Sequence, residues 1–318
     1  MEEMLIGPYI RQKRLDKGWT QEYLCDGICT APTLSRIETN DRTPSSSVLK
    51  ALLERLGLPA GQFFALLSEN DIAVDRLQKK IRDDDIRLRR AAKPEQDKIR
   101  EQILTDLEEL EKLGGEDNRF VRQFILSTKA GIGRPEGPYS PEERLEMLLE
   151  AIRLTVPRFD LGKIASFSYT VEEIMLVNQI ARVYANSGNR RKAIGISSQL
   201  LKHIEKNNAS LNHYPRQFCL VASNCALDLA YEKLYKKAVK LAEKGQKVCI
   251  ERGEYQFLPT FTAVLAECWY FLGDPEKSTA LYHQAYVLYR SFGDSRNLAI
   301  MRQEMKERLG LEPPYEMW

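Results

Sequence analysis

The stretch TQEYLCDGICTAPTLSRIE, residues 20–38, constrains the fold of this chain more than any other. Thr20 and Thr30 are residue types that cap helix N-termini, and Gly27 between them favours a turn because glycine readily adopts positive φ. Pro32 falls in the first turn of the second helix, where a missing N–H is tolerated. We therefore expect a short helix, a tight turn and a second helix. A helix that exposes small and polar side chains at its N-terminal end can enter a DNA major groove, although an ordinary helical hairpin is the alternative for this stretch alone.

The flanks extend this pattern. Apolar spacing predicts further helices over 5–17, 46–56 and 59–67. Residues 6–64 as a whole resemble the five-helix DNA-binding domain of the Cro/phage-repressor family, at Gly7, Ile10, Arg11, Arg14, Gly18, Thr20, Gln21, Leu24, Ser35, Arg36, Ile37, Glu38, Leu52, Leu56 and Phe63. One departure is Asn40, which stands where the family usually has Gly after the third helix. Asparagine tolerates the left-handed conformation, so we expect the turn to survive.

This resemblance implies roles for individual residues. Arg14 is expected to form a partly buried ion pair with Glu38, tying the first helix to the recognition helix. Thr33 is placed to contact a thymine methyl group, Arg36 a guanine or a phosphate, and Gln21 a phosphate. The full set that we expect to contact DNA is Arg11, Gln21, Thr30, Ala31, Thr33, Ser35, Arg36 and Arg42.

The net charge of the chain neither indicates nor excludes a DNA partner. The 318 residues carry a net charge of +2, and residues 1–66 hold eight basic and eight acidic side chains. Non-specific attraction to phosphates should therefore be modest, and affinity should depend on dimerisation and on the placement of contacts. With 43% hydrophobic and 29% charged residues, the chain should be globular and is long enough for two or three domains.

A charge-rich segment separates the two halves of the chain. Residues 68–98 are poor in large apolar side chains, and ten basic against five acidic residues from Arg76 to Arg100 give this part a net +5. We interpret 1–67 as the DNA-binding domain and 68–95 as a helical linker. The linker is either solvated or lies near DNA phosphates, and the sequence does not decide between these two interpretations.

Residues 96–318 are predicted to be helical without strands, and they repeat. Three segments align (180–194, 226–239 and 266–281), with turns 45 and 40 residues apart. Shared positions are a small residue (Ala181, Ala226, Ala266), a large one (Tyr184, Leu229, Trp269), a turn residue (Gly188, Lys233, Gly273) and a second small one (Ala193, Ala238, Ser278). Weaker pairs join 97–113 with 117–131, followed by 141–156. These pairs resemble tetratricopeptide repeats with lengthened loops, so we expect about five pairs in a right-handed superhelical solenoid.

A solenoid of this kind presents a concave groove that typically binds a peptide. Asparagine side chains can hydrogen-bond both the N–H and the C=O groups of a bound backbone. Reading the first helix of each pair at helical spacing gives the groove candidates Asn178, Arg182, Asn186, Asn224, Tyr231, Glu267 and Tyr270. For each of them, a solvated surface position is the alternative.

The architecture as a whole resembles the Rgg/PlcR (RNPP) family of peptide-responsive regulators. The resemblance implies an all-α, cytoplasmic homodimer that binds double-stranded DNA at a pseudo-palindromic promoter and is switched by a short imported signalling peptide. We expect the hinge of that switch in residues 68–98, because a switch needs two arrangements with different ligand affinity. Two alternatives stay open: a protein-binding scaffold or antiactivator with a vestigial helix-turn-helix, and a phage-type arbitration regulator.

Enzyme and membrane interpretations find no support in the sequence. The three histidines have no metal or triad spacing, and no phosphate-binding glycine motif is present, so we expect no catalysis, no metal and no cofactor. The six cysteines lack zinc-site or disulfide spacing and are expected to be reduced and mostly buried. No run of 18 apolar residues exists, and the acidic start MEEMLIGPYIRQKR lacks a signal-peptide core.

Overall fold

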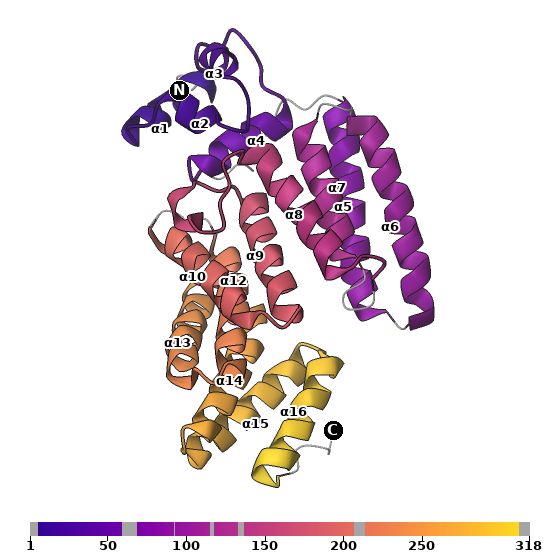
Figure 1. The fold of residues 1–318 in the computed structure, drawn as a ribbon, viewed down its shortest axis with the longest axis vertical. Helices are drawn as coiled ribbons and strands as arrows, with labels where there is room; N and C mark the ends of the chain where they lie inside the picture. Colours follow the sequence, from indigo (N-terminus) through magenta and orange to yellow (C-terminus); the bar gives the residue numbers. More distant parts are fainter. Residues whose placement is uncertain are drawn as a thin grey trace. The chain divides into compact units, whose positions relative to one another are not determined.

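The computed structural model describes residues 6–58, 69–91, 93–114, 118–132, 137–206 and 214–311. All regular structure within these ranges is helical (Figure 1). By packing, the chain forms two compact units: residues 1–163 with 167–183, and residues 164–166 with 184–318. The predicted all-α class, with a helix-turn-helix at the N-terminal end, is confirmed.

The helix-turn-helix is built from α1 (Ile6–Asp16), α2 (Gln21–Cys25), α3 (Ala31–Glu38) and α4 (Ser46–Arg55). Thr20, Thr30 and Ser45 cap the last three of these helices by accepting hydrogen bonds from backbone N–H groups, as their residue types favour. Their apolar faces meet in one core, formed by Ile10, Leu24, Cys25, Ile28, Leu34, Ile37, Ala51, Leu52, Leu53 and Leu56. The helix expected over 59–67 lies outside the described residues.

Asn40 keeps the turn after α3, as expected for a residue that tolerates left-handed backbone. Its φ is 61°, and its Oδ1 accepts a hydrogen bond from the Gly7 backbone N–H at 3.2 Å. A Cβ atom at Gly7 would collide with the Ile37 carbonyl oxygen. Glycine at this position therefore allows the N-terminus of α1 to pack closely against the end of α3.

The segment interpreted as a helical linker is helical, and it is packed against the helix that follows it. Residues Glu69–Arg90 form α5, which pairs with α6 (Lys93–Gly114) (Figure 1). Ile81 is fully buried and Leu88 is 4% exposed, in a cluster shared with Ile103 and Leu107 of α6. Only a few large apolar residues are needed when they recur on one helical face, so the high charge of the segment masked a core-forming stripe.

The first helical pairs are offset from those expected. We predicted that 97–113 would pair with 117–131, but α6 pairs chiefly with α5, and α7 (Arg119–Gly131) pairs with α8 (Pro141–Thr155). The reason is the additional helix α5, which takes the position next to α6. A capping box begins α8, because the Ser140 and Glu143 side chains each accept a hydrogen bond from the other's backbone N–H group.

The three clear repeats correspond to α9 (Val171–Asn186) with α10 (Arg190–Lys206), α12 (Pro215–Tyr231) with α13 (Tyr235–Arg252), and α14 (Leu258–Phe271) with α15 (Pro275–Ser291). All three aligned turn residues have left-handed backbone, including the non-glycine Lys233 at φ 59°. The aligned small residues Ala193, Ala238 and Ser278 are fully buried. A further helix, α16 (Ser295–Leu309), and two short 3-10 turns, Ile164–Ser166 and Tyr255–Phe257, complete the described elements.

The cysteines are reduced in this fold, and the helices can be checked for membrane-spanning length. All six cysteines are free thiols, and all but Cys29 are buried. Cys219 and Cys249 in the second unit place their Sγ atoms 3.4 Å apart. None of the helices in the described part of the chain combines the length and hydropathy that a bilayer crossing requires.

Candidate functional site

The recognition helix α3 presents a short polar surface. Thr30 Oγ1 accepts a hydrogen bond from Thr33 N at 3.3 Å and lies 2.9 Å from Thr33 Oγ1, which fixes the N-terminal turn of the helix. Arg36 is exposed, whereas Ala31, Thr33 and Ser35 are half-buried. The opposite face is anchored in the core by Leu34 and Ile37. The helix thus offers one long cation and several short side chains, a combination that fits a major groove.

A buried ion pair holds α3 to α1. Arg14 Nε lies 2.7 Å from Glu38 Oε1, and Arg14 Nη2 lies 2.8 Å from Glu38 Oε2. Arg14 also donates to the Trp19 carbonyl oxygen, and Gln21 Nε2 donates to Glu38 Oε2 at 2.8 Å. The hydrogen bond to Glu38 raises the pKa of Arg14, although burial lowers it. The Gln21 amide, which we expected to aim at a phosphate, is therefore engaged within the protein.

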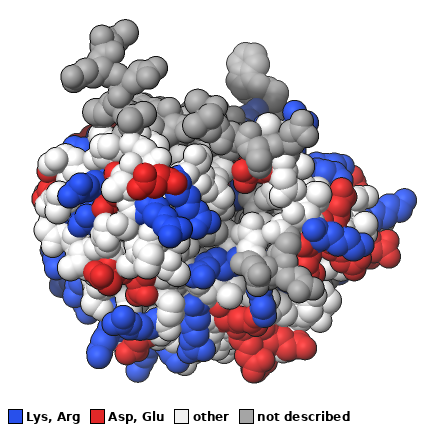
Figure 2. Space-filling model, turned by 90° about the horizontal axis from the view of Figure 1, so that it is seen from above, with Lys and Arg blue, Asp and Glu red and all other residues white. Residues whose placement is uncertain are grey.

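The remaining DNA candidates are exposed: Arg11 on α1, Thr30 just before α3, and Arg42 after α3. On the face shown in Figure 2, the Lys and Arg side chains of the described residues are interspersed with Asp and Glu. Binding to DNA would therefore depend on a few placed contacts more than on a broad basic surface.

Arg55, at the end of α4, joins the helix-turn-helix to the helices that follow it in the first unit. Its guanidinium donates to the carbonyl oxygens of Leu24 and Thr155 at 3.3 Å and lies 3.2 Å from Glu173 Oε1 at the start of α9. It also donates to the Asp26 carbonyl oxygen. Arg55 is 7% and Glu173 1% exposed, so both charges are removed from water and depend on each other.

The turn between α2 and α3 lies against α8. Gly27 has a φ of 72°, and a Cβ atom there would collide with the Thr155 carbonyl oxygen. The Gly27 carbonyl oxygen accepts a hydrogen bond from Arg119 Nη1 at 2.7 Å. Tyr23 Oη lies 2.9 Å from Ser168 Oγ. The turn that orients the recognition helix is thus fixed to the helical repeats and not only to its own domain.

We call the contacts of the helix-turn-helix with Thr155, Ser168 and Glu173 the junction. A cavity of about 560 Å³ lies beside it, between α4, α5, α7 and α9. Its volume falls within the range of ligand-binding pockets. Phe120, Phe124 and Met175 contribute apolar lining, and Gln78, Gln123 and Gln179 contribute amides. Gln123 is already engaged, because its Nε2 donates to the Ala151 carbonyl oxygen and to Thr155 Oγ1.

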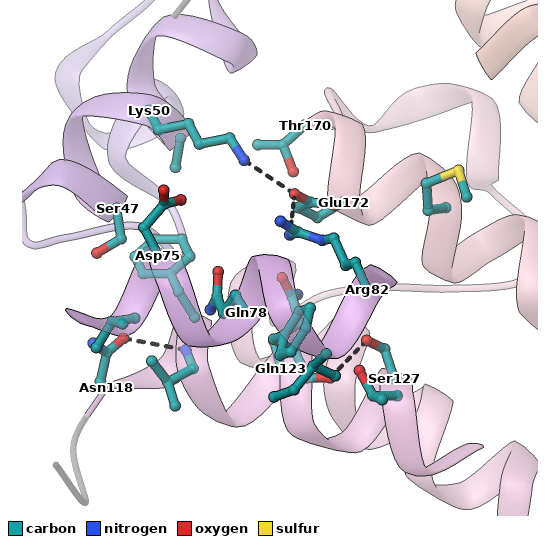
Figure 3. Close-up of a pocket in the computed structure, with 18 of the residues that line it drawn as sticks. Ser47, Lys50, Asp75, Gln78, Arg82, Asn118, Gln123, Ser127, Thr170 and Glu172 are labelled. Carbon is teal, nitrogen blue, oxygen red and sulfur yellow. Dashed lines mark hydrogen bonds and ion pairs between the residues drawn. The ribbon is translucent and has the colours of Figure 1, made fainter. Parts of the chain in front are cut away.

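Two cations meet one carboxylate at the cavity wall (Figure 3). Lys50 Nζ of α4 lies 3.0 Å from Glu172 Oε1 of α9, and Arg82 Nη2 of α5 lies 3.2 Å from the same oxygen. Burial raises the pKa of Glu172, but the two cations outweigh this effect, and the net pKa is lowered. The neighbouring Glu54 is 8% exposed, and burial raises its pKa to about 7. The cluster links three helices, one of them from the helix-turn-helix.

The groove candidates fall in both units. In the first unit, Asn178 is 4% exposed and Arg182 is half-buried. In the second unit, Asn186 is exposed and Asn224 is half-buried. The candidate Tyr231 is also exposed, and the Arg190 guanidinium lies 4.6 Å from its ring centre. Two further candidates have contacts of their own: Glu267 pairs with Arg308 at 3.0 Å, and Tyr270 packs edge-on against Phe271.

Sequence reasoning missed the cavity and the junction. Asp75, Gln78, Arg82 and Asp85 recur at spacings of three and four residues, so they mark one polar helical face that the sequence could have revealed. Nothing in the sequence pairs Arg55 with Glu173, because 118 residues separate them and each looks like an ordinary helix-terminal charge.

Comparisons with known proteins find matches both to the helix-turn-helix segment and to the fold of the chain. Residues 10–63 match the helix-turn-helix family. A search of curated protein sequences returned no match. Among solved structures, Bacillus thuringiensis PlcR in complex with the peptide PapR7 and DNA is 18% identical, with a TM-score of 0.57, over 93% of this chain and 98% of that one. The apo form of the same protein is 18% identical, with a TM-score of 0.55, over 94% and 98%. The fold of this chain is thus similar to that of PlcR along nearly its full length.

Proposed function

We propose that this chain is a sequence-specific DNA-binding transcriptional regulator controlled by a short signalling peptide. The observation that carries the DNA part is the polar face of α3, with exposed Arg36 and half-buried Thr33 and Ser35, packed on a hydrophobic core inside a segment that matches the helix-turn-helix family. In this reading α3 enters the major groove, Arg36 contacts a base edge or a phosphate, and Arg11 and Arg42 contact the backbone. The regulator acts in the cytoplasm as a homodimer on a pseudo-palindromic site.

The peptide part rests on the helical repeats. Repeats of this kind use their inner surface to bind extended or helical segments. The similarity in fold to PlcR, whose solved complex contains a peptide and DNA, supports the same combination here. The residues that we propose to contact the peptide are Asn178, Arg182, Asn186, Asn224, Tyr231, Glu267 and Tyr270.

A scaffold with a vestigial helix-turn-helix is the less favoured function. The described helix-turn-helix has side-chain N-caps on α2, α3 and α4, the buried Arg14–Glu38 pair and an exposed Arg36 on α3, so it presents an ordered surface suited to DNA. A phage-type arbitration regulator would share both activities, so it differs from our proposal in biological setting and not in chemistry.

Substitution of Arg36 tests the DNA part. Binding sites are first selected from random duplex DNA with the wild-type protein, and affinity for the selected site is then measured by gel shift. Arg36→Ala should weaken specific binding by about 1–3 kcal/mol if the guanidinium reads a base edge, and it should relax specificity at one position. If Arg36 contacts a phosphate instead, the substitution should lower the affinity for all DNA sequences by a similar factor.

The matched control is Arg296→Ala, which removes an exposed arginine from α16. It changes the net charge by the same amount but should leave specific affinity unchanged. Wild-type affinity of the Arg36→Ala protein would refute the assignment of α3, and failure of the wild-type protein to select any sequence would refute the DNA-binding function itself.

A further inference from the structure

The cavity in the first unit carries an excess of acidic side chains. Among the described residues, its lining includes the carboxylates Glu54, Asp71, Asp75, Asp85 and Glu172 and two cations, Lys50 and Arg82. Even when Glu54 is protonated, this described lining keeps more negative than positive charge. A cavity of this sign attracts cationic groups and repels anionic ones.

The two cations are already occupied. Lys50 and Arg82 both contact Glu172, at 3.0 and 3.2 Å, so neither offers an unpaired charge to an incoming carboxylate. Asp75 differs, because it takes part in no hydrogen bond or ion pair with the described residues. In Figure 3 its carboxylate points from α5 towards α4, between Ser47 and Lys50. Asp75 is exposed and lines the cavity, so a ligand can reach it.

A second group in the lining also lacks a partner. The Oε1 atom of Gln179 on α9 is buried and has no hydrogen-bond partner among the described residues. A buried acceptor without a donor is unfavourable by about 1–3 kcal/mol, which a bound N–H group would relieve. Phe120, Phe124 and Met175 in the same lining offer apolar contact to the rest of a ligand.

We propose that this cavity binds a peptide through a cationic side chain, a lysine or an arginine, which pairs with Asp75. A backbone or side-chain N–H of the same peptide donates to Gln179 Oε1, and its apolar residues pack on the aromatic lining. The inference rests on the proposed peptide control. It places a peptide site in this cavity, apart from the groove residues named above, and it assigns that site a preference for a lysine or arginine side chain. Because Lys50 and Glu54 of α4 line the same cavity, the peptide would touch the DNA-binding domain directly.

The test uses three synthetic heptapeptide pools and the full-length protein. All peptides are acetylated and amidated so that their termini are neutral, and the pools differ only in a fixed central residue: Lys, Gln or Glu. Retained peptides are identified by mass spectrometry, resynthesised with each of the three central residues, and titrated by calorimetry. We expect the Lys form to bind wild-type protein at least tenfold more tightly than the Gln form, and the Glu form to bind most weakly.

Asp75→Asn should remove the preference for Lys over Gln and leave the Gln form bound as before. The matched control is Asp83→Asn, an exposed aspartate on the same helix that does not line the cavity; it should keep the wild-type preference. Thermal unfolding of each variant checks that the fold is intact.

The possible outcomes separate this inference from the proposed function. A preference for Glu, or a Lys preference that survives in Asp75→Asn, would overturn the cavity assignment while leaving peptide control in place. Retention of no peptide from any pool by a protein that still binds its selected DNA would overturn both the cavity assignment and peptide control. Loss of the Lys preference in Asp75→Asn, with DNA binding unchanged, would support the cavity site.

Discussion

Arg14 and Glu38 show how a single pair can organise a small domain. Both side chains are more than nine-tenths buried, and each has several partners: Arg14 contacts Glu38 and the Trp19 carbonyl, while Glu38 also accepts from Gln21. Removing water from two charges is unfavourable, and the loss is offset only while all these contacts are made. The pair therefore fixes the position of α3 relative to α1 and disfavours other arrangements of the two helices.

Arg14→Ala is predicted to lower the free energy of unfolding by about 3–5 kcal/mol, because Glu38 would remain buried without its cation. Urea unfolding of the full chain measures the change. Arg11→Ala on the same helix removes an exposed arginine and should change stability by no more than about 0.5 kcal/mol. Equal midpoints for the two variants would show that the Arg14–Glu38 pair contributes nothing beyond a surface contact.

At the scale of the element, the turn between α2 and α3 has two tasks. It reverses the chain within the helix-turn-helix, and it lies against the C-terminal end of α8, where the Thr155 carbonyl leaves no room for a side chain. Arg119 Nη1 of α7 donates a hydrogen bond to the Gly27 carbonyl oxygen. The same glycine therefore serves a local conformation and a contact between segments that are far apart in the sequence.

Gly27→Ala and Gly18→Ala separate these two tasks. Both glycines have left-handed backbone, with φ of 72° and 65°, so alanine at either site is unfavourable by about 1–2 kcal/mol. Around Gly18 there is open space, whereas at Gly27 the new methyl group would also push against Thr155. Gly27→Ala should therefore destabilise the chain clearly more than Gly18→Ala in urea unfolding. Similar losses would mean that the turn does not press on α8.

At the scale of the whole molecule, the chain divides into two compact units that do not follow its repeats. The first unit joins the helix-turn-helix to α5–α8 and to α9 as far as Val183, and the second holds the remaining repeats. Within the first unit, charged side chains of α4 contact the start of α9: Arg55 pairs with Glu173, and Glu54 accepts a hydrogen bond from the Val171 N–H at 3.1 Å. A change at α9 would therefore act directly on the DNA-binding domain.

Glu54 makes this contact sensitive to pH. Burial raises its pKa in the folded protein to about 7 from an ordinary value of 4.5; Lys50 lowers the pKa, and Glu172 and Glu173 raise it. Since the folded state favours the protonated form, the contribution of Glu54 to stability is fully present below its unfolded pKa and is lost as pH rises through about 7. The expected loss is on the order of 3 kcal/mol across this window.

Glu54→Gln should flatten this pH dependence and stabilise the protein above pH 7, since the amide oxygen can still accept from Val171 N. Thermal unfolding between pH 5 and pH 8 provides the measurement. Glu142→Gln, on the exposed start of α8, should leave the wild-type dependence unchanged. A stability gap between wild type and Glu54→Gln that does not vary with pH would contradict this account.

Local patterns were sufficient to predict much of this molecule. The caps at Thr20 and Thr30, the left-handed turn at Asn40 and the aligned small residues at Ala193 and Ala238 all depend on residues close in the chain, so their effects can be read directly from the sequence. The family resemblance also implied the Arg14–Glu38 pair, which the structure contains.

Only the tertiary structure determined how the helices are paired and what lies between them. The charge of α5 concealed the few apolar residues that pack it against α6, and the Arg55–Glu173 contact joins residues whose local sequence gives no sign of a partner. The cavity depends on four helices meeting, so Asp75 and Glu172 acquire a shared environment only after packing. Helix formation follows from short-range preferences, but pairing and burial depend on which faces meet across long sequence separations.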